Sequence, residues 1–132
     1  TLIAPRLTAL AGGSLNASLI GMATLAVGTL IALAPSVTMM FVSVIFVTSG
    51  FFVTHAVIAP YLNALDPVRA GLINSVYISI YYIGGAIGSY VPGLVYERAG
   101  WAMFIAALMA VMVAGGLMVF RARRLAPADL PS

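Results

Sequence analysis

The 132-residue sequence contains no cysteine and no lysine, a single histidine and only three acidic residues. Without cysteine there is no disulfide framework and no thiolate metal site, and one histidine excludes a multi-histidine metal cluster. We therefore predict neither a metal nor a cofactor. Charged residues make up only 7% of the chain, against roughly 25% in soluble domains. This scarcity of charge predicts that water is not the main solvent of the protein.

Apolar residues make up 63% of the chain, and the mean hydropathy is +1.14. A membrane-spanning helix needs about 20 mostly apolar residues. Backbone amides in hydrocarbon have to be paired within their own segment, which favours helices over strands. The predicted fold class is an all-α, polytopic transmembrane helix bundle. Four spans are expected, at about residues 14–33, 37–59, 71–95 and 101–120.

Prolines and polar residues predict where the spans end. The first is expected to stop at Pro35, and the second at Pro60, before a short polar loop over residues 61–70. Residues 97–100 separate the third span from the fourth. Pro92 predicts a bend near the outer end of the third span.

The two ends of the chain have no domain character. We interpret residues 1–13 as the end of a preceding span followed by a cytoplasmic loop around Arg6, and residues 121–132 as an exposed cytoplasmic tail. The sequence begins with Thr1 and not with methionine. We therefore expect it to be part of a longer protein.

The positions of the arginines predict the orientation in the membrane. Cytoplasmic loops carry an excess of arginine and lysine, and alternate loops lie on the same side. The opposite side has only Arg98, next to Glu97. The carboxyl terminus is therefore predicted to be cytoplasmic. The arginines form no basic face interleaved with aromatic residues, so nucleic-acid binding is not expected. The five arginines on the predicted cytoplasmic side are Arg6, Arg69, Arg121, Arg123 and Arg124.

The spans differ in polarity. The fourth has no side chain more polar than the indole of Trp101, as expected for a helix surrounded by lipid, with Trp101 as an interfacial anchor. The second and third contain histidine, hydroxyl and amide side chains, which predict an interior face. The candidates for a substrate or proton pathway are Thr48, Phe52, His55, Asn74, Tyr77 and Tyr81.

His55 has two interpretations. An ionisable group within a span is costly and usually faces a cavity or a partner, and imidazole changes charge near neutral pH, which favours substrate contact or proton handling. If the helix ends at Pro60, however, His55 lies only about 7 Å inside the end, where headgroup water solvates it as a structural residue. Matched depths of antiparallel spans place His55 near Tyr77 and Thr48 near Gly84. For the tyrosines, ordinary packing is the alternative to a functional role.

Small residues form two adjacent ridges on the third span. Such ridges allow helices to approach closely in lipid, although small residues at four-residue spacing are common in all membrane bundles. The candidates for helix packing or gating are Gly84, Gly88 and Pro92 on one ridge and Gly85, Ser89 and Gly93 on the other.

The order of these motifs resembles the carboxyl-terminal part, helices nine to twelve, of a major facilitator superfamily transporter of the bacterial inner-membrane type. The resemblance covers nearly the whole chain. It rests on the short turn Leu33–Ser36, Gly50–Phe52 before His55, the stretch Pro67–Gly71, the run Tyr81–Gly88, Pro92-Gly93, and Gly100-Trp101 with Phe104.

The resemblance implies a multi-pass inner-membrane protein with a cytoplasmic carboxyl terminus and twelve helices in all. It implies a secondary active transporter, with no enzymatic activity, that moves a small solute by alternating access. Coupling to protons is a further expectation. Its partners would be the lipid bilayer, the solute and the missing amino-terminal helices, with the second span lining the cavity and the third forming part of the moving wall.

Two alternatives belong to other classes. A self-contained four-helix membrane protein, either a small multidrug pump or a non-catalytic assembly subunit, is the first. A small pump relies on an acidic residue deep in its first span, and this sequence has none there. An intramembrane enzyme is the second, and it requires a clustered nucleophile, base or metal ligands, which the scattered serines and one histidine do not supply.

Overall fold

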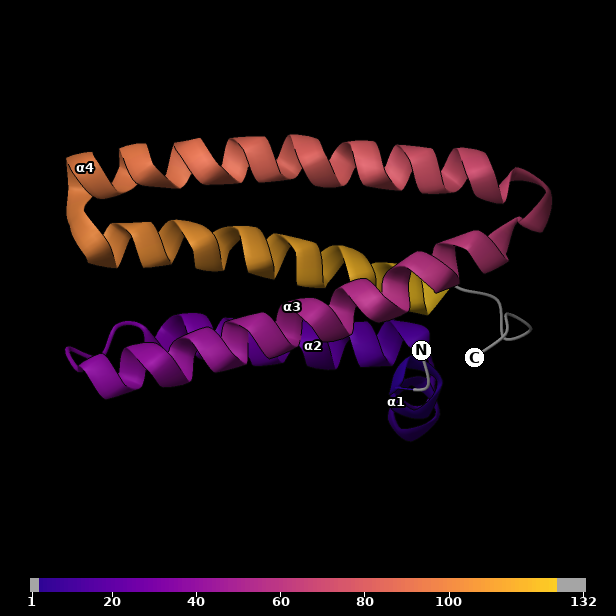
Figure 1. Cartoon of the computed structure of the whole chain (residues 1–132), viewed down its shortest axis with the longest axis horizontal. Helices are drawn as coiled ribbons and strands as arrows, with labels where there is room; N and C mark the ends of the chain where they lie inside the picture. The colour runs from indigo at the N-terminus through magenta and orange to yellow at the C-terminus, as the bar shows by residue number, and fades with distance from the viewer. Residues whose placement is uncertain (1–2, 126–132) are drawn as a thin grey trace.

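The computed structural model describes residues 3–125, and this part of the chain is all-helical, as predicted. Three helical segments are long and apolar enough to cross a membrane, namely α2, α3 and the continuous stretch of η1 and α4. Figure 1 shows them lying roughly along one direction, with α1 turned away from it. The elements are α1 (Ile3–Ala11), α2 (Ser14–Ile31), α3 (Val37–Leu65), the 3-10 turn η1 (Pro67–Arg69) and α4 (Ala70–Leu125).

α4 folds back on itself at Gly100. The backbone there has φ 78° and ψ −176°, and Gly100 is the residue of α4 with non-helical angles. Glycine adopts this conformation without the Cβ clash that other residues meet. Two arms result, residues 70–99 and 101–125, which run antiparallel in Figure 1. The predicted loop at 97–100 was therefore too long. The backbone at Pro92 stays helical, so the sharp turn does not fall there.

α3 continues through Pro60 to Leu65, so the prediction that the helix stops at Pro60 was wrong. Spanning helices tolerate a proline when local adjustments satisfy the carbonyl freed by its missing N–H. Helix α3 stops instead at Asp66, whose backbone is extended (φ −147°, ψ 91°), as expected before Pro67. The Asp66 carboxylate then accepts a hydrogen bond from the Arg69 amide at 3.1 Å and caps η1.

Both ends of the described chain are more helical than predicted. Arg6 lies within α1 and not in a loop, and the turn falls at Gly12 and Gly13, whose positive φ values end the helix. At the other end α4 extends past Phe120 to Leu125, because residues 121–125 keep the helical backbone. Residues 126–132 of the predicted tail lie outside the described residues.

Glycines bring α2 and α3 into close contact. A Cβ added at Gly21 would collide with the Thr54 hydroxyl, and one added at Gly28 would lie 2.7 Å from the Val47 amide nitrogen. A Cβ at Gly50 would overlap the Gly21 carbonyl oxygen. Backbones in lipid associate by such close packing. The interface between α2 and α3 is therefore the tightest part of the bundle, and it presents α3 to α4.

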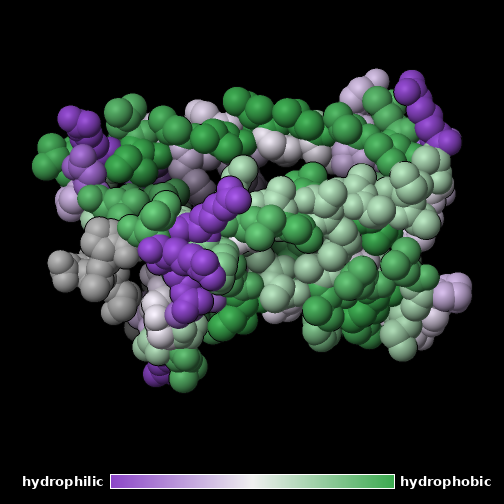
Figure 2. All heavy atoms as spheres, turned by 180° about the vertical axis from the view of Figure 1, so that it is seen from behind, coloured by the Kyte–Doolittle hydropathy of each residue, from purple (hydrophilic) through white to green (hydrophobic). Residues whose placement is uncertain are grey.

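In Figure 2 the most hydrophilic residues gather toward the two ends of the molecule, with one group reaching inward on this face, and mostly hydrophobic residues lie between them. Figure 1 places α1, η1 and the end of α4 at one end, and with them the arginines of those three elements. Arg98 lies at the opposite end, next to the Gly100 turn. There the indole N–H of Trp101 donates to the Ala32 carbonyl at 2.9 Å and ties α4 to the end of α2.

Candidate functional site

His55 lies within α3, and its side chain faces the first arm of α4. The Nδ1 atom of His55 and the hydroxyl of Tyr77 form a hydrogen bond of 2.7 Å. The hydroxyl donates when the neutral imidazole carries its proton on Nε2, and it accepts once the ring is protonated. The predicted juxtaposition of His55 and Tyr77 is confirmed. Their role in transport stays a prediction.

Aromatic rings surround this hydrogen bond. The His55 ring stacks on Phe51 with centroids 5.7 Å apart and planes at 11°, and it lies 5.2 Å from the Tyr81 centroid. We call Phe51, His55, Tyr77 and Tyr81 the His55 cluster. The sequence spacing of these residues explains the cluster. Residues four apart share a helix face, so α3 contributes the neighbouring rings of Phe51 and His55, and α4 contributes those of Tyr77 and Tyr81. Phe51 and Tyr81 remain 37% and 42% exposed, which leaves aromatic surface free.

The helix beyond His55 is longer than the sequence suggested. From His55 to Leu65 it continues for about ten residues, or about 15 Å at 1.5 Å per residue, in place of the 7 Å measured to Pro60. This length weakens the interpretation of His55 as a residue solvated at the helix end.

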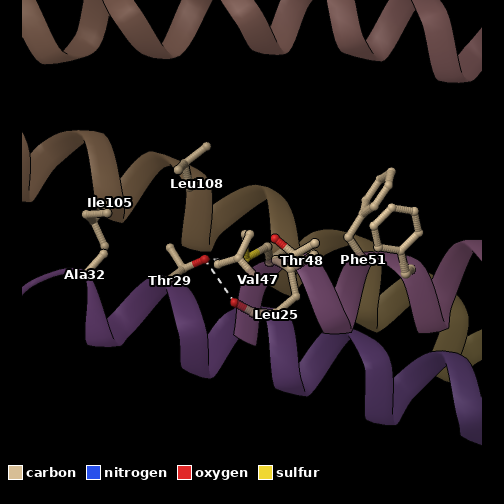
Figure 3. A pocket seen from close by; sticks show the side chains of 10 residues that line it. Leu25, Thr29, Ala32, Val47, Thr48, Phe51, Ile105 and Leu108 are labelled. Atoms are coloured by element: carbon tan, nitrogen blue, oxygen red, sulfur yellow. Dashed lines mark hydrogen bonds between the residues drawn. The ribbon is translucent and has the colours of Figure 1, made fainter. Parts of the chain in front are cut away.

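Thr48 and Phe52 border a different space, an apolar cavity of about 600 Å³ between α2, α3 and the second arm of α4. Figure 3 shows the close hydrogen bond from the Thr29 hydroxyl to the Leu25 carbonyl on one wall, with Phe51 at one end. Phe51 thus lines this cavity while stacking on His55. The predicted approach of Thr48 to Gly84 was wrong, because an added Cβ at Gly84 would meet no atom within 4 Å. The first arm of α4 lies apart from α3 over most of its length (Figure 1).

The four glycines of the predicted ridge on the third span pack against nothing in the described chain. An added Cβ at any of the four would have open space around it, and residues 81–90 are all exposed. Ser89 donates only to the Ala86 carbonyl of its own helix, at 2.9 Å. Asn74 is half-buried on the same arm. The close-packing function that we predicted for this ridge belongs, within residues 3–125, to the glycines of α2 and α3. The four glycines of the ridge are Gly84, Gly85, Gly88 and Gly93.

A second cavity lies between the end of α3, η1 and the start of α4. It has a volume of about 470 Å³ and is bordered by Arg69 and Asp66 at one side and by Tyr77 at the other. The Arg69 side chain is 74% exposed and its Nε lies 3.8 Å from the Asp66 carboxylate. Such an exposed pair has little strength, so the guanidinium remains available to other anions.

Sequence reasoning missed two features of this region. The stacking role of Phe51 follows from its four-residue spacing to His55, which was visible in the sequence. The participation of Leu25, Thr29 and Met112 in the apolar cavity had no such signal, because it depends on how the second arm of α4 returns after Gly100.

Comparisons of this chain with protein families, with curated proteins and with solved structures find no match. The fold therefore defines the class of the protein: it is a helical protein with three segments long and apolar enough to span a membrane.

Proposed function

We propose that this chain is the carboxyl-terminal part of a secondary active transporter that moves a small solute by alternating access, with proton coupling through His55. The observation that carries the proposal is the 2.7 Å hydrogen bond between His55 and Tyr77, which joins two segments long and apolar enough to span a membrane. Ionisable groups within such segments usually mark substrate or proton pathways. The chain itself performs no catalytic step in this proposal.

The topology we propose has four crossings, namely α2, α3 and the two arms of α4. The arginines of α1, η1 and the end of α4 would then face the cytoplasm, in line with the positive-inside rule. The exposed arm at residues 81–90 would pack against preceding helices of the same protein, with the resemblance to the major facilitator superfamily as the guide to their number.

Water access at membrane depth tests the proposal without knowledge of the solute. The chain has no cysteine, so a Phe52→Cys variant carries the only thiol within it. Phe52 is 62% exposed and borders the apolar cavity, whereas Val111, 72% exposed on the second arm of α4, serves as the lipid-facing control. The full-length protein, with any other cysteine replaced, is treated with a membrane-impermeant maleimide in right-side-out and inside-out vesicles.

A transporter cavity predicts labelling of the Phe52→Cys variant from both sides and no labelling of the Val111→Cys variant. Labelling of neither variant would instead favour the alternative, a four-helix membrane protein that serves as an assembly subunit. Equal labelling of both would mean that the bundle does not exclude water, and would also refute the proposal.

A further inference from the structure

The charges of the described residues lie at the two ends of the bundle. Asp66 and Glu97 lie beside the turns, and the arginines lie in the same end regions. Within the apolar part of residues 3–125, His55 is the side chain that becomes positive on protonation. A positive charge at this depth requires a partner of opposite sign or strong hydrogen-bond acceptors.

The groups that face His55 supply no such partner. Phe51 comes from its own helix, and Tyr77 and Tyr81 come from α4. Helix α2 packs on α3 through Gly21 and the neutral hydroxyl of Thr54. Among the described residues, protonated His55 therefore has an acceptor in Tyr77 but no carboxylate within its cluster.

The surroundings of His55 also offer flat apolar surface. Phe51 and Tyr81 flank the imidazole, and each leaves more than a third of its surface exposed. Aromatic rings bind other flat rings by offset or edge-to-face stacking in addition to apolar burial. The cavity lined by Arg69 and Asp66 also borders Tyr77, and it lies at the end of the bundle that holds the arginines of α1, η1 and α4. An excess of positive charge at one end of a molecule raises the local concentration of anions there.

We infer that the solute is a small aromatic monocarboxylate, which binds at the His55 cluster with its carboxylate paired to protonated His55 and its ring against Phe51 and Tyr81. This inference rests on the proposed transport function and adds the substrate class. Binding of the anion and of the proton are then linked, because each supplies the charge that the other needs.

Three ligands with the same phenylpropyl skeleton and different charge test the inference. They are 3-phenylpropionate, its neutral amide and 3-phenylpropylamine, titrated calorimetrically into the purified full-length protein at pH 6 and pH 8. We expect the carboxylate to bind at least about tenfold more tightly than the other two at pH 6, and to lose most of that advantage at pH 8. Buffers of different ionisation enthalpy should reveal proton uptake on binding at pH 8.

Three variants separate the parts of the site. His55→Gln should remove the preference for the carboxylate and the pH dependence of that preference. Phe51→Leu should lower the affinity for all three ligands alike and keep the pH dependence. Tyr90→Phe is the control. Tyr90 lies on the same arm of α4 as Tyr77 and Tyr81, is 67% exposed and is outside the His55 cluster. This variant should bind like the wild type.

Tightest binding of the amine, or a carboxylate preference unchanged by His55→Gln, would overturn the inference. Absence of binding by all three ligands in a protein whose Phe52→Cys variant is labelled from both sides would overturn the substrate class alone. Binding as expected in a protein whose variant is not labelled would support the anion site and refute transport.

Discussion

Replacement of Gly50 by alanine tests the packing of α2 on α3. The new Cβ would overlap the Gly21 carbonyl oxygen and lie 2.5 Å from the Leu25 amide nitrogen and 2.8 Å from Leu25 Cβ. Two of these three atoms are backbone, so no side-chain rotation relieves the overlap and the helices have to separate. Overpacking costs typically 1–3 kcal/mol, and we expect the upper end, about 3 kcal/mol.

The gain in helix propensity from glycine to alanine offsets about 1 kcal/mol of this cost. The net effect of Gly50→Ala is therefore a loss of about 2 kcal/mol in the free energy of unfolding, roughly a 30-fold change in the equilibrium constant. Within the 132-residue chain, where no preceding helices cover the first arm of α4, Gly84→Ala is the matched control, because its Cβ meets no atom within 4 Å and only the favourable propensity term remains. The two variants should thus differ by about 3 kcal/mol.

Reversible unfolding of the detergent-solubilised 132-residue chain by SDS, followed by circular dichroism, measures both variants against the wild type. A Gly50→Ala variant as stable as the Gly84→Ala variant would refute the proposed contact between the two backbones.

Three further substitutions have defined outcomes. Tyr77→Phe should cost about 0.5–1.5 kcal/mol and change the tautomer ratio of His55 in nitrogen NMR, whereas unchanged histidine shifts would contradict their hydrogen bond. Trp101→Phe removes the donor to the Ala32 carbonyl and should lower stability by about 1 kcal/mol in SDS unfolding, and a neutral result would show that the N–H is not used. Gly100→Ala should lower the free energy of unfolding by about 1–3 kcal/mol, because a φ of 78° is strained for any residue with a Cβ. Equal melting temperatures of variant and wild type would argue against that turn.

The helical class followed from composition, but the helix ends depended on details that composition does not contain. Pro60 and Pro67 have the same ring and the same missing N–H. Only Pro67 follows a residue, Asp66, whose carboxylate caps the next turn, and there the helix stops. At Gly100 the polar neighbours suggested a loop, yet one glycine with positive φ is enough to reverse the chain.

The central contact of the candidate site was predictable because it depends on two quantities that the sequence contains. Helical rise gives the depth of each residue, and antiparallel topology matches the depths of His55 and Tyr77. The same argument failed for Thr48 and Gly84. The depth of a residue along the bundle does not tell how its helix is rotated or how far the two helices lie from each other. Near Gly84 the first arm of α4 lies apart from α3.

The two sets of glycines show which sequence pattern fixes helix pairing. Four-residue spacing drew attention to Gly84 and Gly88, but a ridge specifies no partner. Gly21 and Gly28 on α2 are seven residues apart, and so are Ser43 and Gly50 on α3. Seven residues are about two turns, so each pair shares a face, and an antiparallel register sets Gly21 against Gly50 and Gly28 against Ser43.

The structure has this register. The Cβ that Gly28 lacks would lie 3.0 Å from the Ser43 carbonyl oxygen, and the one that Gly50 lacks would overlap the carbonyl oxygen of Gly21. Two helices pack closely along their length when both carry small residues at the same sequence spacing. Their backbones can then approach at one pair of small residues and again at the next pair. The ridge of α4 lies outside this register, and a Cβ added at Gly84 or Gly88 would meet no atom within 4 Å in the described chain.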